Sequence, residues 1–298
     1  MKSMASGLTI FLAWTFALSG LPIGAAEGNP LSMLILESKN DEPLKVVTGE
    51  TSRLDQPESA ASTFKIWLTA LALEEKILTR SSRYDCCEPH LYHGKKARVG
   101  LRQALILSSN DFFREVASRL GLKKLNQGLA SLHLTPKPQT RSVRSIAAAI
   151  HGDRFRVTPR QQHEAMRALV LGSLPVSRET RQTLREALEW PVPENAHWRV
   201  YGKTGCYGGA VWFVGWGESR PTLVPSGAIA SQPRPEVKIV TVFAPGNLTQ
   251  RPEVMRQFFR RFGIDWSDTL LQGLGATGKL PDSTTNTGSE PAATGTKP

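Results

Sequence analysis

The sequence predicts an α+β fold in which strands from both ends of the chain pair in one antiparallel sheet flanked by helices. Two segments typical of strands lie near the start, at 32–36 and 44–48, with a polar turn at 39–42 between them. Strands again dominate after residue 199, and the segment between is mainly helical in its hydrophobic spacing. The order of strands, helices and strands indicates a single sheet with helices packed against it.

A helix from Ser62 to about Leu78 is predicted to lie at the centre of the domain. Apolar side chains occur on nearly every face of it, and a helix that is apolar all round is normally buried. Ser62 would then stand at the N-terminus of a core helix, where unpaired backbone N–H groups and the positive end of the helix dipole lie.

The later elements follow from capping residues and periodicity. The stretch 81–98 is polar and is expected to be irregular, and a helix break is expected at 108–110. Thr158, Pro159 and Gln161 form a capping pattern that predicts the start of a helix. The other expected elements are helices over 101–107, 111–121 and 252–262, and strands over 199–203, 210–216 and 237–244.

Length and composition are those of an ordinary globular protein. The 298 residues are 40% hydrophobic and 21% charged, enough for one large or two small domains. The net charge of +11 would favour an anionic polymer or surface. No basic stripe alternates with aromatic residues, so the sequence predicts no nucleic-acid partner.

The N-terminus is typical of an export signal. Lys2 precedes the apolar run 8–23, and the small residues Gly24-Ala25-Ala26 favour cleavage before Glu27. Retention of this segment as a membrane anchor is the alternative. The expected organisation is a signal peptide at 1–26, a catalytic domain at 27–270 and a disordered tail at 271–298, in an exported protein that is periplasmic or secreted.

The three cysteines have no spacing that would bind a metal, and no metal site is predicted. Cys86 and Cys87 are adjacent, and Cys206 lies far along the chain. An exported location permits one disulfide with one thiol left over, and three unpaired thiols are the alternative.

Three short motifs indicate the chemistry. They are Ser62-Thr63-Phe64-Lys65, Ser108-Ser109-Asn110 and Lys203-Thr204-Gly205, in this order. Each alone occurs by chance in many chains of this size, whereas the ordered set supplies the parts of an acyl-transfer site that attacks a strained or peptide-like amide.

The first two motifs would provide the nucleophile and its proton transfers. Residues i and i+3 share a helix face, so Lys65 can reach Ser62 and act as its base, provided that burial lowers the pKa of the amine. Ser108 could relay a proton to the leaving nitrogen, and Asn110 could hydrogen-bond a substrate amide. The alternative for Ser108-Ser109-Asn110 is a polar loop that caps the next helix.

The third motif would hold the substrate. Lys203 adds positive potential and Thr204 a hydroxyl, and both suit a substrate carboxylate. Gly205 lets a ligand approach the strand closely. The backbone N–H groups of Cys206 and Ser62 could together form an oxyanion hole. A simple edge strand with a solubilising lysine is the alternative.

With these motifs in place, the chain resembles the penicillin-recognising serine acyl-enzymes, nearest to the class D β-lactamases and the related β-lactam sensor and penicillin-binding transpeptidase domains. The resemblance covers roughly 32–266 and also involves the segments 70–74, 101–104, 154–162, 174–177 and 212–216. It implies a five-stranded antiparallel sheet with helices on both sides. It also implies the roles given above for Ser62, Lys65, Ser108, Asn110, Lys203, Thr204, Gly205 and Cys206.

The chain departs from the class D pattern at three places. Asn110 replaces the usual apolar residue of the second motif, no Tyr-Gly-Asn follows between Leu125 and Ile150, and Ile150 stands where a tryptophan is usual. In class D enzymes carbon dioxide carbamylates the motif lysine. Asn110 and the missing tryptophan argue against this step, so Lys65 is expected to act mainly as a free amine, with no cofactor.

Three functions remain open from the sequence. The leading one is an exported class D-like β-lactamase, a serine hydrolase of antibiotic resistance that opens and hydrolyses the β-lactam ring. The others are a D,D-peptidase or transpeptidase acting on peptidoglycan stem peptides, and a β-lactam sensor that does not hydrolyse. The partner is thus a β-lactam or a stem peptide, with a membrane involved only if the N-terminal segment stays uncleaved. The oligomeric state is not predicted.

Overall fold

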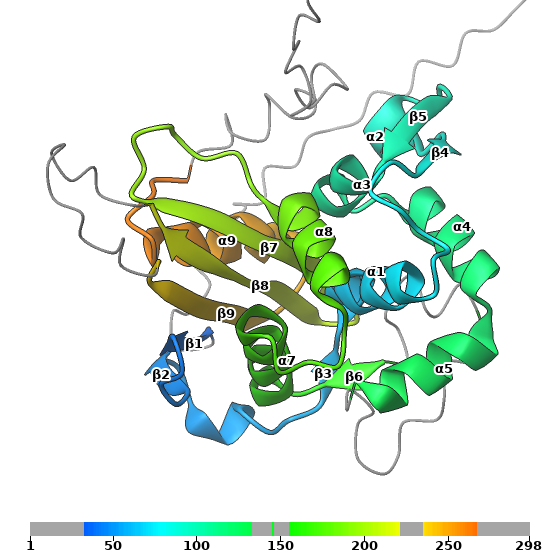
Figure 1. Ribbon diagram of the computed structural model, residues 1–298. Coiled ribbons are helices and arrows are strands. Elements are labelled where there is room, and N and C mark those ends of the chain that lie inside the picture. The colour runs from blue at the N-terminus through cyan, green and yellow to red at the C-terminus, as the bar shows by residue number, and fades with distance from the viewer. Residues whose placement is uncertain (1–32, 133–144, 146–154, 221–234, 267–298) are drawn as a thin grey trace, which may run out of the picture.

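The computed structural model describes residues 33–132, 145, 155–220 and 235–266, and its centre is a five-stranded antiparallel sheet (Figure 1). β1 at the start of the described chain pairs with β9 near its end, so the sheet is built from both ends. This confirms the predicted α+β architecture. The strands, in the order β2-β1-β9-β8-β7, are Lys45–Thr48, Leu34–Lys39, Val237–Pro245, Ala210–Ser219 and Trp198–Tyr207.

Helices cover both faces of this sheet (Figure 1). α9 (Arg251–Arg260) packs on one face, where Phe258 stacks on Phe213 of β8 with 3.8 Å between the ring centroids. α7 (Pro159–Leu171) contacts β8 and β9 on the other face. Because β8 is buried on both sides, its sequence is a nearly continuous apolar run without the alternation of a half-exposed strand.

The central helix is α1 (Phe64–Glu74), and every residue from Phe64 to Ala72 is buried, as its apolar composition predicts. It begins two residues later than expected. Ala61–Thr63 form instead a 3-10 turn, η3, that leads directly into α1. Ser62 therefore lies in a tight turn at the entrance of the core helix.

The other helices surround α1 and the sheet. The break at 108–110 separates α3 from α4 as predicted, and the capping box at Thr158 starts α7. α5 and α8 are additional to the sequence expectations. α8 has two threonines among its five buried positions, which weakens its hydrophobic pattern. The bounds are Leu101–Leu107 for α3, Asn110–Leu120 for α4, Leu122–Ser131 for α5 and Arg178–Leu188 for α8, with 3-10 turns at Thr51–Arg53 (η2) and Leu248–Gln250 (η4).

The stretch expected to be irregular, 81–98, is instead a small ordered unit. β4 (Arg83–Cys86) pairs antiparallel with β5 (Ala97–Gly100), and the short helix α2 (Pro89–Tyr92) lies between them. Each strand has only four residues and carries charged side chains, so neither shows a readable alternation. The two-residue strands β3 (Glu58–Ser59) and β6 (Arg156–Val157) escape detection for the same reason.

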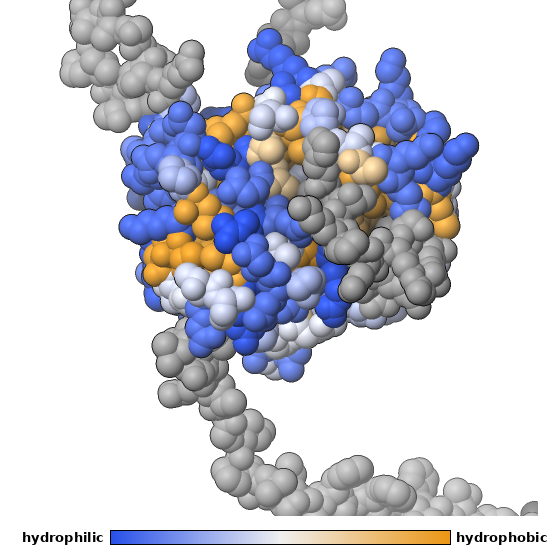
Figure 2. Space-filling view, turned by 90° about the horizontal axis from the view of Figure 1, so that it is seen from below, coloured by the Kyte–Doolittle hydropathy of each residue, from blue (hydrophilic) through white to orange (hydrophobic). Residues whose placement is uncertain are grey.

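Two sequence expectations lie outside the described residues: the signal peptide at 1–26 and the tail at 271–298. Among the residues that the structure describes, no helix is long and apolar enough to cross a membrane. Figure 2 shows a largely hydrophilic face with separate hydrophobic areas. Within the described chain, the exposed large apolar side chains are Leu171, Tyr207 and Leu248.

A buried polar cluster ties α7 to the sheet. His163 is fully buried, and its Nε2 lies 3.0 Å from Ser38 Oγ of β1 while its Nδ1 lies 3.3 Å from Thr241 Oγ1 of β9. Burial lowers the pKa of His163 to about 4, and the Arg167 charge acts in the same direction. The folded protein thus holds this imidazole in its neutral form at pH values where an unfolded histidine, with an ordinary pKa of about 6.5, takes up a proton.

This difference predicts an acid-dependent loss of stability. The contribution of His163 is fully present above the unfolded pKa and falls away as the pH drops from about 6.5 to about 4. The loss in the free energy of unfolding should be on the order of 2–3 kcal/mol. The free energy of unfolding, measured with urea at a series of pH values, should change less steeply with pH in this window for His163→Gln than for the wild type. The exposed His90→Gln serves as the control and should keep the wild-type slope. Equal slopes for wild type and His163→Gln would contradict this assignment.

Candidate active site

Ser62, the predicted nucleophile, is half-buried in the turn η3. The residue before it, Ala61, has a φ of +49°, a left-handed conformation that makes the chain turn sharply into α1. Thr63 Oγ1 donates a 2.5 Å hydrogen bond to Ala60 O, and Gln162 of α7 donates to Thr63 Oγ1. The turn is thus held from two sides, which fixes the position of Ser62.

Lys65, the predicted base, is fully buried and has three hydrogen-bond acceptors. Its Nζ lies 2.7 Å from Ser108 O, 3.2 Å from Ser108 Oγ and 2.7 Å from Asn110 Oδ1. It also lies 5.4 Å from the centroid of the Phe113 ring. A buried ammonium needs such partners because an unpaired charge in the interior is very costly.

The environment of Lys65 is suited to a base at neutral pH. Burial lowers its pKa to about 7, the Glu88 carboxylate opposes this shift, and the Arg251 charge adds to it. Among the described residues, no hydrogen bond joins Lys65 Nζ to Ser62 Oγ, and the amine is oriented toward the second motif. Loss of one proton frees a lone pair and one of these three contacts, which lets the amine turn to Ser62.

The second motif both caps a helix and serves the site. Ser108 ends α3 in a left-handed conformation, with a φ of +61°, and directs its carbonyl and hydroxyl at Lys65. Ser109 is the N-cap of α4, and its Oγ accepts a hydrogen bond from Phe112 N at 3.3 Å. Asn110, the first residue of α4, directs its amide oxygen at Lys65. The capping interpretation therefore holds for Ser109, and the roles of Ser108 and Asn110 toward a substrate stay predictions.

A buried acid that no sequence pattern identifies contacts this motif. Glu88, only 6% exposed, lies between β4 and α2. Its Oε2 accepts from Ser109 Oγ at 2.6 Å, and its Oε1 accepts from the backbone N–H of Asn110 and, at 3.2 Å, from that of Asp111. Glu88 stands alone within a polar stretch, so no spacing rule identifies it.

The third motif lies on the edge strand β7, against η3. A Cβ added at Gly205 would lie 3.0 Å from Thr63 Cγ2 and 3.2 Å from both Ala60 O and Ala61 Cβ. A side chain there would therefore push β7 away from the turn that carries Ser62. The sequence interpretation attributed this glycine to the approach of a ligand, and the structure adds the packing of the site itself as a reason.

The backbone of β7 directs alternate N–H groups at the open edge of the sheet. Trp190 donates from its backbone N to Val200 O and from its Nε1 to Gly202 O, so the main-chain groups of these even-numbered residues point outward. In an antiparallel strand the N–H and C=O of one residue point the same way, with a period of two. The N–H of Cys206 consequently points to the same edge, beside the turn that holds Ser62, as an oxyanion hole requires.

Two cationic side chains flank this strand. Lys203 is fully buried, and its Nζ donates to Thr204 O at 2.9 Å. Burial holds its pKa well below the ordinary value, and the charges of Lys65 and Arg251 lower it further. Arg251, which the sequence interpretation missed, donates from Nη2 to Thr204 Oγ1 at 3.3 Å, and its buried Nε has no hydrogen-bond partner among the described residues.

This arrangement suits an anionic group. Burial removes water from the Arg251 guanidinium and lowers its pKa. An incoming carboxylate would take the place of the missing water by accepting charge-assisted hydrogen bonds. Thr204 lies between Lys203 and Arg251, so the predicted carboxylate site has an amine, a guanidinium and a hydroxyl. Arg251 escaped notice because it lies 47 positions beyond Thr204, at the start of α9.

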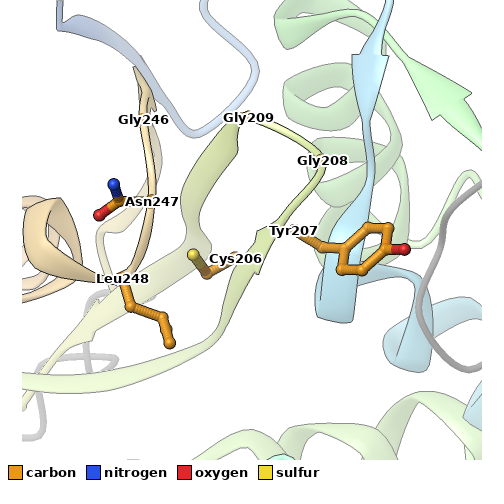
Figure 3. A pocket seen from close by; sticks show the side chains of 7 residues that line it. All are labelled: Cys206, Tyr207, Gly208, Gly209, Gly246, Asn247 and Leu248. Carbon is orange, nitrogen blue, oxygen red and sulfur yellow. The ribbon is translucent and has the colours of Figure 1, made fainter.

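A pocket of about 420 Å³ adjoins the end of β7 (Figure 3). The Cys206 side chain lies on one side of the strand and the Tyr207 ring on the other. The pocket is lined by Cys206, Tyr207, Gly208, Gly209, Gly246, Asn247 and Leu248. It therefore links the β7–β8 turn with the segment that leads to Arg251.

The cysteines are free thiols in this structure. Cys86 is buried, Cys87 is exposed and Cys206 is half-buried. Of the two arrangements that the sequence left open, the structure has the unpaired one. Burial raises the pKa of Cys86 to about 11, so this thiol stays protonated near neutral pH.

Solved structures support the fold assignment. A class D β-lactamase from Bacillus subtilis is 15% identical, with a TM-score of 0.62, and the alignment covers 79% of this chain and 93% of that one. A class D β-lactamase from Fusobacterium nucleatum subsp. polymorphum is 17% identical, with a TM-score of 0.57, and the alignment covers 77% and 91%. The chain thus has the class D β-lactamase and transpeptidase fold, with the five-stranded sheet that the resemblance implied.

Sequence comparisons point to the same group. A probable peptidoglycan D,D-transpeptidase FtsI from Caulobacter vibrioides is 28% identical over an alignment of 132 residues, with a coverage of 37% of this chain and 22% of that protein. The chain therefore spans about a fifth of the length of this relative. The model of the penicillin binding protein transpeptidase domain matches residues 31–237, a range that contains all three motifs. The chain belongs to the penicillin binding protein transpeptidase domain family.

Proposed function

We propose that this chain is a class D-like serine β-lactamase, which forms an acyl-enzyme at Ser62 and then hydrolyses it. The observation that carries the proposal is the buried Lys65, whose pKa of about 7 leaves a large fraction of the amine neutral at physiological pH. A lysine with an ordinary pKa would be almost wholly protonated and unable to act as a base. Family membership supports a penicillin-recognising acyl-transfer site.

The first step is acylation. Neutral Lys65 takes the proton of Ser62, and Ser62 Oγ forms a bond to the carbonyl carbon of the β-lactam ring. Negative charge develops on the carbonyl oxygen, where the N–H groups of Ser62 and Cys206 stabilise it. Preorganised donors of this kind are worth about 3–4 kcal/mol each.

The second step opens the ring. The C–N bond breaks, and the leaving nitrogen takes a proton from Ser108 Oγ, which recovers one from Lys65 Nζ, 3.2 Å away. The substrate carboxylate meanwhile binds Thr204, Lys203 and Arg251, which orients the ring toward Ser62.

The third step is hydrolysis. Ring opening returns Lys65 to its neutral form, so the same amine can take a proton from a water molecule that attacks the ester carbonyl. The ester C–O bond then breaks, and Ser62 Oγ recovers a proton from Lys65. We propose that Lys65 does this as a free amine and not as a carbamate. The Asn110 amide oxygen accepts a hydrogen bond from Lys65 Nζ, which favours the uncarbamylated lysine.

A D,D-peptidase or transpeptidase is the second candidate, and Asn110 favours it. Its side chain lies at the entrance of α4, where it can hydrogen-bond a peptide substrate as well as Lys65. The partial sequence similarity to a probable D,D-transpeptidase points the same way. For this candidate the substrate is a peptidoglycan stem peptide. In either case we propose an exported location, as the N-terminal sequence favours.

A fluorescent penicillin separates the two candidates. The wild type should bind the label covalently, and after excess label is removed the adduct should decay with release of hydrolysed product. Ser62→Ala should form no adduct by intact-protein mass spectrometry, whereas the exposed Ser81→Ala should behave as the wild type. A persistent adduct would favour the penicillin-binding peptidase, and an adduct in Ser62→Ala would overturn the nucleophile assignment.

Added bicarbonate should leave the decay rate of the adduct nearly unchanged if Lys65 stays a free amine.

Arg251 should act mainly through the substrate carboxylate. Arg251→Ala should slow acylation by a carboxylate-bearing β-lactam about tenfold at low substrate concentration, as expected for the loss of a charge-assisted hydrogen bond. The exposed Arg260→Ala on the same helix removes equal charge and should have little effect. If Arg251→Ala slows acylation by a β-lactam with an esterified carboxylate to the same extent, Arg251 does not recognise the carboxylate.

A further inference from the structure

Glu88 is a buried carboxylate whose hydrogen bonds all go to one stretch of three residues. It lies outside the three motifs, and its acceptor oxygens are used by Ser109 Oγ and by the N–H groups of Asn110 and Asp111. Burial of a carboxylate is costly unless its oxygens are satisfied. Two backbone donors at the start of α4 and one hydroxyl meet this requirement.

The contact does more than cap α4, because it joins the helix to a separate part of the chain. Ser109 is the N-cap and accepts from Phe112 N. Glu88 comes from the unit of β4, α2 and β5, and it accepts from the first two backbone N–H groups of α4, those of Asn110 and Asp111, as well as from the cap hydroxyl. It thereby fixes the backbone of Asn110, and with it the direction of the amide oxygen that lies 2.7 Å from Lys65 Nζ.

We propose that Glu88 is a positioning residue for the acyl-transfer reaction, which holds the start of α4, and with it the Asn110 amide oxygen, against Lys65. This inference deepens the proposed function and rests on it. Glu88 would not touch the substrate. It would act through the second motif and through its charge.

The charges around the two groups set the expected sign. Three charged or titratable side chains lie around Lys65. They are Glu88 from the β4–α2 connection, Lys203 from β7 and Arg251 from α9. Glu88 is the anion among them, and it raises the pKa of Lys65 against the lowering effects of burial and Arg251. The titratable side chains with an electrostatic interaction with Glu88 are Lys65, Cys86 and Tyr92. Burial raises the pKa values of the Cys86 and Tyr92 side chains, so both stay neutral near pH 7.

Removal of the charge with little change of shape gives the test. In Glu88→Gln, the acid limb of the acylation rate against pH should move to lower pH, because Lys65 loses its nearby anion and releases its proton more easily. The maximal rate at high pH should fall about tenfold, because the amide cannot accept all three hydrogen bonds. A residue needed only for folding would not move the acid limb.

Two further variants control this result. Glu88→Asp keeps the charge but shortens the side chain, so its maximal rate should fall while its acid limb stays at the wild-type pH. Asp111→Asn removes a carboxylate from the same helix turn, one that bonds Cys87 N and Arg114, and it should leave the limb in place. If Glu88→Gln does not fold, a wild-type maximal rate in folded Glu88→Asp would overturn the positioning role, and a reduced one would support it.

The readout separates this inference from the proposed function. Acylation is followed by intact-protein mass spectrometry with penicillin and, independently, with a sulfonyl fluoride, from which Ser62 Oγ displaces fluoride to form a sulfonyl ester. A wild type modified by either reagent provides the reference for Glu88, and an acid limb in Glu88→Gln at the wild-type pH overturns the role of Glu88 alone. Modification by the sulfonyl fluoride but not by penicillin overturns the β-lactam substrate and leaves Glu88 testable. A wild type that neither reagent modifies overturns both.

Discussion

The set of contacts that holds the buried amine of Lys65 determines most of this site. A buried lysine in the first turn of a core helix must direct its ammonium to acceptors, because an unpaired charge in the interior is very costly. Those acceptors come from the break between α3 and α4, which explains why Ser108 adopts a left-handed conformation and why Asn110 opens α4. The same burial that requires these partners lowers the pKa of Lys65 to about 7. One constraint therefore sets both the arrangement of the side chains around Lys65 and the low pKa that the proposed base requires.

The sheet edge supplies the second half of the arrangement. β7 is an edge strand, so its outward N–H groups are available, and Gly205 allows η3 to pack directly on it. The proposed nucleophile, Ser62, and the proposed oxyanion donor, Cys206 N, thus come from segments about 140 positions apart in the sequence, joined by a close backbone contact. Cations gather at the same edge, where burial leaves them poorly solvated and receptive to a carboxylate.

The sequence predicted those features that have a local signature. Helix α1 has no polar face, α7 has a capping box, and the three motifs combine residue types with fixed spacing, so the sheet, the core helix and the motif residues could all be located. Glu88 and Arg251 could not, because each acts on a segment distant in the chain and lies in an unremarkable polar context. The hairpin of β4 and β5 was missed because four-residue strands with charged side chains carry too little pattern. The roles assigned to the motif residues remain predictions until the chemistry is measured.

An NMR titration of the lysine side chains measures the protonation of Lys65 itself. Lysines labelled with ¹³C at Cε change their chemical shift as they lose a proton, and Lys65→Arg identifies the signal of Lys65. One lysine signal should titrate near pH 7, well below those of the exposed lysines, and should vanish in Lys65→Arg. A signal for Lys65 that titrates in the ordinary range, near pH 10, would exclude Lys65 as the base, because a permanently charged lysine cannot activate Ser62 at neutral pH.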